Sequence, residues 1–316
     1  MPALRPFRFL AEAGAISDGR ALADAARRAE ASGIDVLVIP DHLIDQLGPI
    51  PALATAATAT ERLRIGTFVF NNDLRHPAVL AQDLASLDVL SGGRLEIGIG
   101  AGWNEPEYRA IGLPFDPVGT RVARLAESIA VLKGSFGPGS FSFVGKHYTI
   151  TDFDGRPKPI QRPHPPFFVG GGGRRLLSLA GREAQIVGLA PRILPGPRGD
   201  PLSITIAATE EKIGWVREAA GDRFEQLELN TYPSVSPIIV TDHARREVAK
   251  LARRLAARTG IEVSPDELLE SPHIFIGSIE QLAHKFRSLR ERLGISSIMV
   301  GALDELPGLV ERLAGS

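Results

Sequence analysis

Residues 35–44, with the sequence DVLVIPDHLI, contain an apolar run that ends in an aspartate and a histidine. The run has no polar alternation, which favours a strand covered on both faces. Such strands are typical of parallel sheets flanked by helices, where ligands bind beyond the carboxyl ends of the strands. Asp41 and His42 follow such an end directly, so we expect a binding site there. The alternative is a capping role or a buried structural role for the pair.

The alternation of strand and helix continues along the whole chain. Eight strand-like segments, each followed by a helix-like one, lie at about residues 7–13, 35–39, 63–71, 94–102, 166–171, 184–190, 226–235 and 296–301. Repeated strand–helix units predict a parallel sheet with crossover helices. Eight units in 316 residues fit an α/β protein with a (β/α)8 TIM barrel better than an open doubly wound sheet, which is the alternative. We therefore expect a single domain over residues 1–316.

Irregular stretches interrupt this pattern. Between 134 and 166 the composition shifts to Gly, Pro and aromatic residues, with a hairpin expected at 141–150. A second irregular segment lies at about 192–208, and two or three helices follow the seventh strand. We interpret these features as insertions after strands 4, 5 and 7 of the barrel, and not as domain boundaries.

The composition excludes several functional classes. The chain is 44% hydrophobic and 23% charged, and its formal net charge is −1, which is ordinary for a soluble globular protein and offers no basic excess for a nucleic acid. The basic residues of 245–258 are expected to form a solvated helix face. The absence of cysteine excludes disulfides, thiolate metal sites and a cysteine nucleophile. No apolar stretch approaches the roughly 18 residues of a membrane span, so we expect a cytoplasmic protein without a membrane partner.

Polar residues at the expected strand ends would line one mouth of the barrel. They are Glu12, Asp41, His42, Asn71, Asn72, Trp103, Asn104, the run Gly170 to Gly173, and Asn230. A histidine at residue 42 can move a proton near neutral pH, and a neighbouring aspartate can fix its tautomer. His76, just before a helix, is either a helix cap or a ligand contact. No cluster has metal-ligand spacing and no G-x-S-x-G motif is present, so we expect no metal and no serine nucleophile.

Two glycine-rich stretches suggest a cofactor. Residues 169–177, VGGGGRRLL, place four glycines between a strand and a helix, where backbone amides and the helix dipole attract an anion. We predict a phosphate site there, the alternative being a tight turn. Residues 97–103, IGIGAGW, lack the G-x-G-x-x-G spacing, and the following residues are not expected to open a helix. Trp103 can stack on a flat ring, or it can simply pack.

These motifs together resemble the luciferase-like monooxygenase superfamily, and in particular its oxidoreductases that use the deazaflavin coenzyme F420. The resemblance covers nearly the full length and is carried by residues 19–42, 61–103, 162–189 and 271–300. It implies a TIM barrel with an insertion, which is usually a homodimer. It also implies a cofactor whose ring lies in the barrel mouth and whose phosphate lies on the loop after strand five.

The resemblance also assigns roles to particular residues. It implies that His42 is catalytic and that the third strand carries a cis peptide bond at Phe68–Val69. The implied cofactor contacts are Asp41, His42, Thr67, Phe68, Val69, Trp103, Gly171, Gly172, Gly173 and Arg174.

One position departs from the family pattern. Sugar-phosphate dehydrogenases of the superfamily have a catalytic glutamate where this chain has Trp103, and Glu105 and Glu107 lie off register. The resemblance implies hydride transfer between C5 of F420 and a substrate carbon, with His42 moving the proton. Because of the departure at Trp103, we expect the substrate to be small, fairly apolar and organic. The alternatives are an FMN-dependent monooxygenase and a non-catalytic protein that binds a flavin or deazaflavin.

Overall fold

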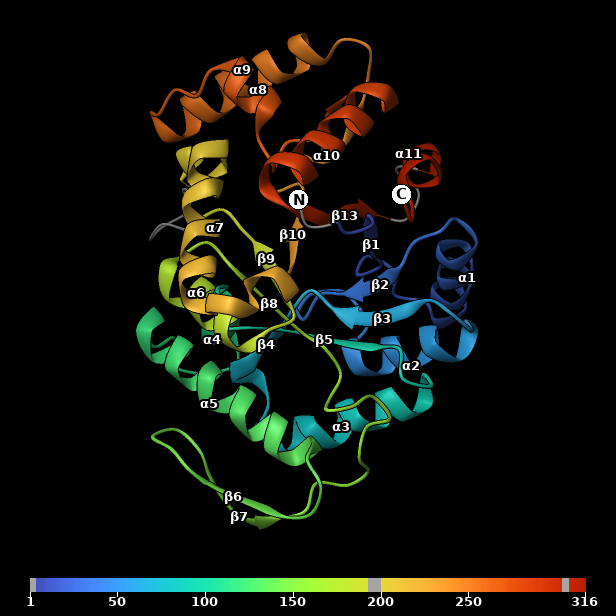
Figure 1. Ribbon diagram of the computed structural model, residues 1–316, viewed down its shortest axis with the longest axis vertical. Helices are drawn as coiled ribbons and strands as arrows, with labels where there is room; N and C mark the ends of the chain where they lie inside the picture. The colour runs from blue at the N-terminus through green and yellow to red at the C-terminus, as the bar shows by residue number, and fades with distance from the viewer. Residues whose placement is uncertain (1–3, 193–199, 303–306) are drawn as a thin grey trace. The chain divides into compact units, whose positions relative to one another are not determined.

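The computed structural model describes residues 4–192, 200–302 and 307–316. It is an α/β protein, and its parallel strands have the order of a (β/α)8 barrel, as predicted (Figure 1). The eight barrel strands lie at the expected positions. They are β1 (Arg8–Glu12), β2 (Val36–Ile39), β3 (Arg64–Thr67), β5 (Leu95–Gly100), β8 (Phe167–Gly171), β9 (Ile186–Leu189), β10 (Glu228–Thr231) and β13 (Ile295–Ala302). No helix among the described residues is both long and apolar enough to cross a bilayer.

The chain divides into two compact parts, which we describe separately. The His42 part comprises Ala13–Glu30 and Val36–Val169, and the glycine-loop part comprises Met1–Glu12, Ala31–Asp35 and Gly170–Ser316. In the His42 part, β2 pairs in parallel with β3, and β3 with β5. All four residues of β2 are buried, as expected for a strand covered on both faces. The helices are α1 (Gly19–Ala31), α2 (Pro49–Ala59), α3 (Pro77–Leu90), α4 (Glu105–Ala110) and α5 (Val118–Phe136).

The expected third strand is interrupted. After β3 the chain passes through a cis peptide bond between Phe68 and Val69, which confirms the prediction, and then forms β4 (Phe70–Asn71) and the short helix η1 (Asn72–Leu74). Strand β5 lies against this interruption and carries glycine at the positions of closest approach. A Cβ on Gly98 would lie 1.8 Å from the Thr67 carbonyl oxygen, and one on Gly100 would lie 2.8 Å from a Val69 methyl.

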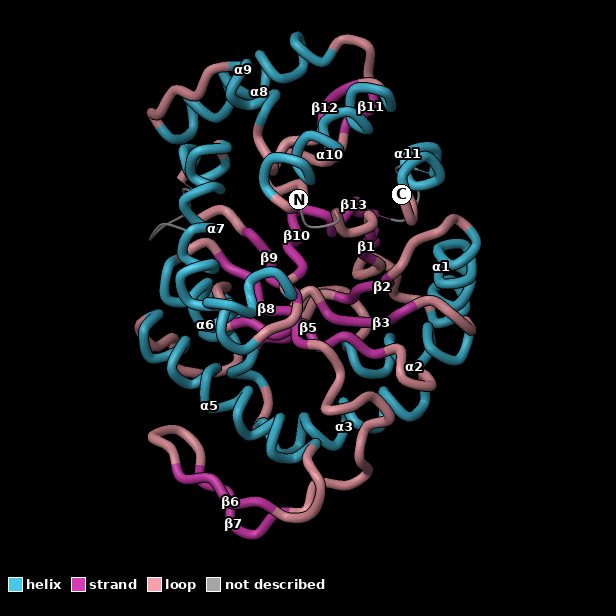
Figure 2. Tube along the Cα trace, in the orientation of Figure 1, coloured by secondary structure: helices cyan, strands magenta, loops and turns pink. Residues whose placement is uncertain are grey.

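The insertion at 134–166 contains the predicted hairpin, formed by antiparallel β6 (Phe141–Val144) and β7 (Thr149–Phe153). Figure 2 shows it lying beyond α3 and α5. Its turn is fixed to α5 by one carboxylate. Glu127 accepts the backbone N–H groups of Lys146, His147 and Tyr148 at 2.8, 2.7 and 3.1 Å.

In the glycine-loop part, β13 pairs in parallel with β1 and β10, and β10 with β9. The helices beside these strands are α6 (Arg174–Glu183), α7 (Ile206–Ala220), η3 (Gly221–Gln226), α10 (Ile279–Leu293) and α11 (Pro307–Leu313). The irregular segment expected at 192–208 follows β9, the sixth barrel strand, and not the fifth. Residues 193–199 of it lie outside the described residues, and η2 (Pro201–Ile204) comes next.

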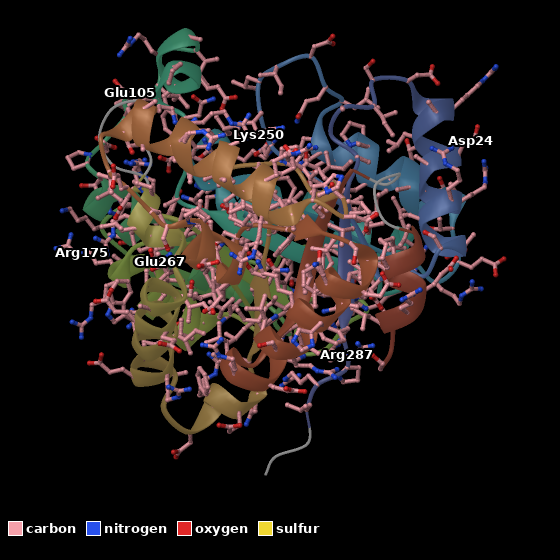
Figure 3. All side chains as sticks on the ribbon, turned by 90° about the horizontal axis from the view of Figure 1, so that it is seen from above. Asp24, Glu105, Arg175, Lys250, Glu267 and Arg287 are labelled. Carbon is pink, nitrogen blue, oxygen red and sulfur yellow. The ribbon has the colours of Figure 1, made fainter. Side chains whose placement is uncertain are left out.

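The insertion after β10 has a small core of its own. It contains α8 (Ala244–Thr259), α9 (Pro265–Glu270) and a two-stranded sheet of β11 (Ile239–Val240) and β12 (Ile276–Gly277). Val248, Leu251 and Leu255 of α8 are buried in this core. The basic residues of 245–258 are all exposed, as predicted; Lys250 of α8 is labelled in Figure 3.

Candidate functional site

His42 lies just beyond β2, and its imidazole is held by a glutamate. Its Nδ1 lies 3.0 and 3.1 Å from the two carboxylate oxygens of Glu107, which is buried on α4. The same carboxylate accepts the Leu43 backbone N–H at 3.2 Å. Because a carboxylate only accepts hydrogen bonds, the neutral imidazole carries its proton on Nδ1. Its Nε2 is then the ring's proton acceptor.

Asp41 is buried and bonded within the protein. Its two oxygens accept the Arg75 guanidinium at 2.6 and 3.0 Å, and one of them also accepts the Asn71 backbone N–H at 3.0 Å. Arg75 in turn lies 5.2 Å from the centre of the Phe70 ring. The expectation that Asp41 fixes the tautomer of His42 is therefore wrong, because Glu107 occupies Nδ1. Asp41 instead joins the end of β2 to the chain after β4.

Trp103 contacts His42. The two rings meet edge to face, with centroids 5.6 Å apart, and the tryptophan is 57% exposed. Leu43 and Ile44, which follow His42 directly, are also exposed. Three large apolar side chains in and beside this segment are thus exposed, although such residues are usually buried in a core.

Thr67, Phe68 and Val69 pack within the same part of the chain. The Thr67 hydroxyl donates to the Gly98 carbonyl at 2.6 Å, and the Phe68 ring lies 5.1 Å from that of Phe168. The Phe68 backbone N–H donates to the Ile39 carbonyl at 3.1 Å, which links this segment to β2. The His42 part therefore holds six of the ten predicted site residues: Asp41, His42, Thr67, Phe68, Val69 and Trp103.

The other four predicted residues lie at the start of α6, in the glycine-loop part. Two of these glycines are required by packing, since a Cβ on Gly171 would lie 2.5 Å from the Leu176 side chain and one on Gly172 would lie 2.4 Å from the Pro191 carbonyl. Gly173 faces open space and begins α6 without a side-chain cap. Arg174 is exposed and pairs with Glu218 at 2.9 Å. The uncapped amides at this helix start are suited to an anion.

Sequence reasoning missed α4 and with it Glu107. Residues 103–108 were not expected to open a helix, which is wrong, because α4 begins at Glu105. The signal was present in the sequence: Asn104 at the cap position, Pro106 in the first turn, and two glutamates at the helix start. Glu107 is off register in the sequence pattern, yet the helix brings it to His42.

Other candidates have structural partners. Asn71 Oδ1 accepts the Tyr108 hydroxyl at 2.9 Å, and Asn230 donates to the Ser297 hydroxyl at 3.0 Å. His76 caps α3, because its Nδ1 accepts the Ala78 N–H at 3.3 Å. Among the residues that the structure describes, no group of three or more His, Cys, Asp or Glu side chains could hold a metal ion.

A family model described as luciferase-like monooxygenase matches residues 4–297. The chain belongs to this family. This luciferase-like protein is 39% identical over 127 residues to the FMNH2-dependent dimethylsulfone monooxygenase of Pseudomonas putida, a match that covers 40% of the chain and 35% of that enzyme. It is 34% identical over 172 residues to the F420-dependent glucose-6-phosphate dehydrogenase of Kineococcus radiotolerans, a match that covers 52% of the chain and 50% of that enzyme. The chain thus matches half or less of the length of these relatives.

Solved structures share the fold over nearly the whole chain of the luciferase-like protein. The F420-dependent tetrahydromethanopterin reductase of Methanopyrus kandleri superposes with a TM-score of 0.76 at 20% identity, covering 98% of both chains. An F420-dependent secondary alcohol dehydrogenase, solved in complex with an F420–acetone adduct, has a TM-score of 0.74 at 18% identity, also covering 98% of both chains. At this level of identity the similarity establishes the fold alone.

Proposed function

We propose that this protein is an F420-dependent oxidoreductase that acts on a small, fairly apolar organic substrate, with His42 moving the proton that accompanies hydride transfer. The contact between His42 Nδ1 and Glu107, at 3.0 and 3.1 Å, carries the proposal. A histidine fixed in this way beyond the end of a barrel strand has the position and chemistry of a general acid–base. The similarity to F420-dependent glucose-6-phosphate dehydrogenase supports the cofactor class.

Each of the two parts, taken by itself, has one feature that suits a flavin-like cofactor. The uncapped start of α6, with Gly173 facing open space, suits the cofactor's phosphate. Exposed Trp103 beside His42 offers an aromatic surface to a planar ring. When bound, F420 supplies the carbon, C5, that accepts or donates the hydride.

The protein's own contribution is proton transfer at one atom. Glu107 holds the proton of the neutral imidazole on Nδ1, so His42 Nε2 is the atom that accepts a proton from a substrate hydroxyl. In the reverse direction, Nε2 of the protonated ring donates that proton. The Glu107 carboxylate stabilises the imidazolium charge that forms between these steps.

Exposed apolar side chains next to His42 in the sequence, and Trp103 in contact with its ring, support an apolar substrate. Leu43, Ile44 and Trp103 are large, apolar and exposed. Trp103 occupies the position at which the sugar-phosphate dehydrogenases of the superfamily carry a glutamate. The chain therefore lacks, at this position, the acidic group that acts on a sugar phosphate in those enzymes. We therefore expect a substrate with a carbonyl, an alcohol or an activated double bond on a hydrocarbon frame.

The proposal is tested by titrating the purified protein with oxidised F420, reduced F420 and FMN. We expect tight binding of F420, and hydride transfer without oxygen consumption. His42→Asn should retain cofactor affinity and lower turnover by about 10²- to 10⁴-fold, the usual contribution of a general acid–base. The same substitution at exposed His284 is the control. Binding of FMN alone, with oxygen uptake, would overturn the proposal.

An FMN-dependent monooxygenase is the second candidate, because the 39% identical stretch belongs to an FMNH2-dependent enzyme. Oxygen consumption with reduced FMN and an organic substrate would favour it. A non-catalytic cofactor-binding protein is the third candidate. In that case His42→Ala would leave cofactor affinity and cellular function unchanged.

A further inference from the structure

Helix α4 carries two buried residues side by side, Glu107 and Tyr108. It spans only six residues, and its cap residue Asn104 makes no side-chain hydrogen bond to the helix start. A helix this short has little stability of its own in water. Its place in the fold, and with it the place of Glu107, must therefore come from side-chain contacts.

Tyr108 makes two of these contacts through its hydroxyl. It is fully buried, and its hydroxyl lies 2.9 Å from Asn71 Oδ1 and 3.1 Å from Asp73 Oδ2. The ring packs edge to face on Phe115, with centroids 5.0 Å apart. Burial, together with the charge of Asp73, raises the pKa of Tyr108 to about 12, so the phenol keeps its proton and remains a donor.

The two acceptors of the phenol lie at the end of β4, where Asn71 is, and in η1, where Asp73 is, and Asn71 is also bonded to the residue before His42. The backbone N–H of Asn71 donates to Asp41 at 3.0 Å, and Asp41 directly precedes His42. Tyr108 thus links α4 to the same backbone that positions the imidazole. The neighbouring residue Gly102 leaves room for the phenol, since a Cβ there would lie 1.9 Å from the hydroxyl oxygen.

A second residue holds the loop before α4 but not the helix itself. The Arg121 guanidinium donates to the carbonyls of Ala101 and Gly102. This contact fixes the chain on the N-terminal side of Trp103. The position of Glu107, one turn further on, depends on α4.

We infer that Tyr108 is a positioning residue, whose hydroxyl keeps Glu107 in contact with His42 by joining α4 to Asn71 and Asp73. The inference rests on the proposed function, in which His42 moves a proton at Nε2. It adds that the tautomer of His42 depends on a phenol that touches neither the imidazole nor the substrate.

The test compares Tyr108→Phe with the wild-type protein by NMR, without cofactor. Nitrogen chemical shifts report which ring nitrogen of His42 carries the proton, and amide exchange of Leu43 reports its bond to Glu107. Glu107→Gln gives the signature of a lost carboxylate. Tyr148→Phe is the matched control, because that phenol, on the hairpin, lies 3.5 Å from the Asn72 side chain.

We expect Tyr108→Phe to shift His42 from the Nδ1–H form toward a mixture of tautomers. We also expect it to speed Leu43 amide exchange roughly two- to tenfold, the effect of one lost hydrogen bond on local opening. Tyr148→Phe should change neither. If Tyr108→Phe leaves both readouts at wild-type values while Glu107→Gln changes them, packing alone holds α4 and the inference is wrong.

Cofactor titration of the same proteins separates this inference from the proposed function. Wild-type protein that binds neither F420 nor FMN contradicts the proposed function, whatever the tautomer. Wild-type protein whose His42 is not in the Nδ1–H form contradicts the inference, even if F420 binds tightly. Should Tyr108→Phe not fold, Asp73→Asn is examined in its place, with the same tautomer shift expected because the phenol loses its charged acceptor.

Discussion

Gly102→Ala should both destabilise the protein and release Glu107 from His42. Gly102 has φ +73°, where a Cβ costs about 1–2 kcal/mol. The new Cβ would also lie 1.9 Å from the Tyr108 hydroxyl oxygen and 2.6 Å from Asn71 Oδ1, and overpacking of this kind costs about 1–3 kcal/mol. Together we expect a loss of about 2–5 kcal/mol in the free energy of unfolding.

Gly112 offers a matched control for this substitution. Its φ is +72°, nearly the same as that of Gly102, but a Cβ there would meet nothing within 4 Å. Gly112→Ala should therefore lose only the backbone contribution of about 1–2 kcal/mol. Urea unfolding measures both variants, with the midpoints compared at constant m value. Equal losses for the two variants would refute the tight contact between Gly102 and Tyr108, and turnover retained by Gly102→Ala would refute its link to the site.

Three further outcomes are expected. Arg94→Met should cost about 3–5 kcal/mol in urea unfolding, because its guanidinium donates four hydrogen bonds around the end of α2 and one to Ser91 at the end of α3, each worth about 1 kcal/mol. Exposed Arg253→Met should cost almost nothing. Burial lowers the pKa of His273 to about 3, so between about pH 6.5 and 3 the unfolded chain binds more protons than the folded one. The free energy of unfolding should therefore fall by up to about 1.4 kcal/mol for each pH unit of acidification in this range. His273→Gln should reduce this slope, whereas His284→Gln should not. We propose a homodimer, for which sedimentation should give about twice 33.9 kDa.

The barrel was predictable because its signals are local. Residues 36–39 are apolar on both faces and form a strand covered on both sides. The alternation of strand-like and helix-like segments locates the other seven strands. The position of His42 beyond a strand end follows from the same pattern. The cis bond at Phe68–Val69 was predicted only by resemblance, since nothing in the composition of that strand indicates it.

The partner of His42 was not predictable in this way. Glu107 lies 65 residues away in the sequence, and its approach depends on a six-residue helix whose direction is set by Tyr108. Asp41 was the nearer carboxylate, but Arg75 neutralises it from 34 residues away. Likewise, the sequence of Gly171–Gly173 predicts a phosphate loop. In the structure, close contacts with Leu176 and Pro191 leave no room for a side chain at two of these three positions. Local pattern identifies the residue types of the site, and long-range contacts assign their roles.

The attachment of its turn to Glu127 makes the β6–β7 hairpin a practical place for engineering. Three consecutive amides of the turn converge on one carboxylate of α5, and the Tyr148 ring adds an edge-to-face contact with His76. A spectroscopic label can therefore be attached at exposed Val144 while the turn stays docked. Replacing that acid by glutamine would weaken the attachment of the turn and leave the barrel intact.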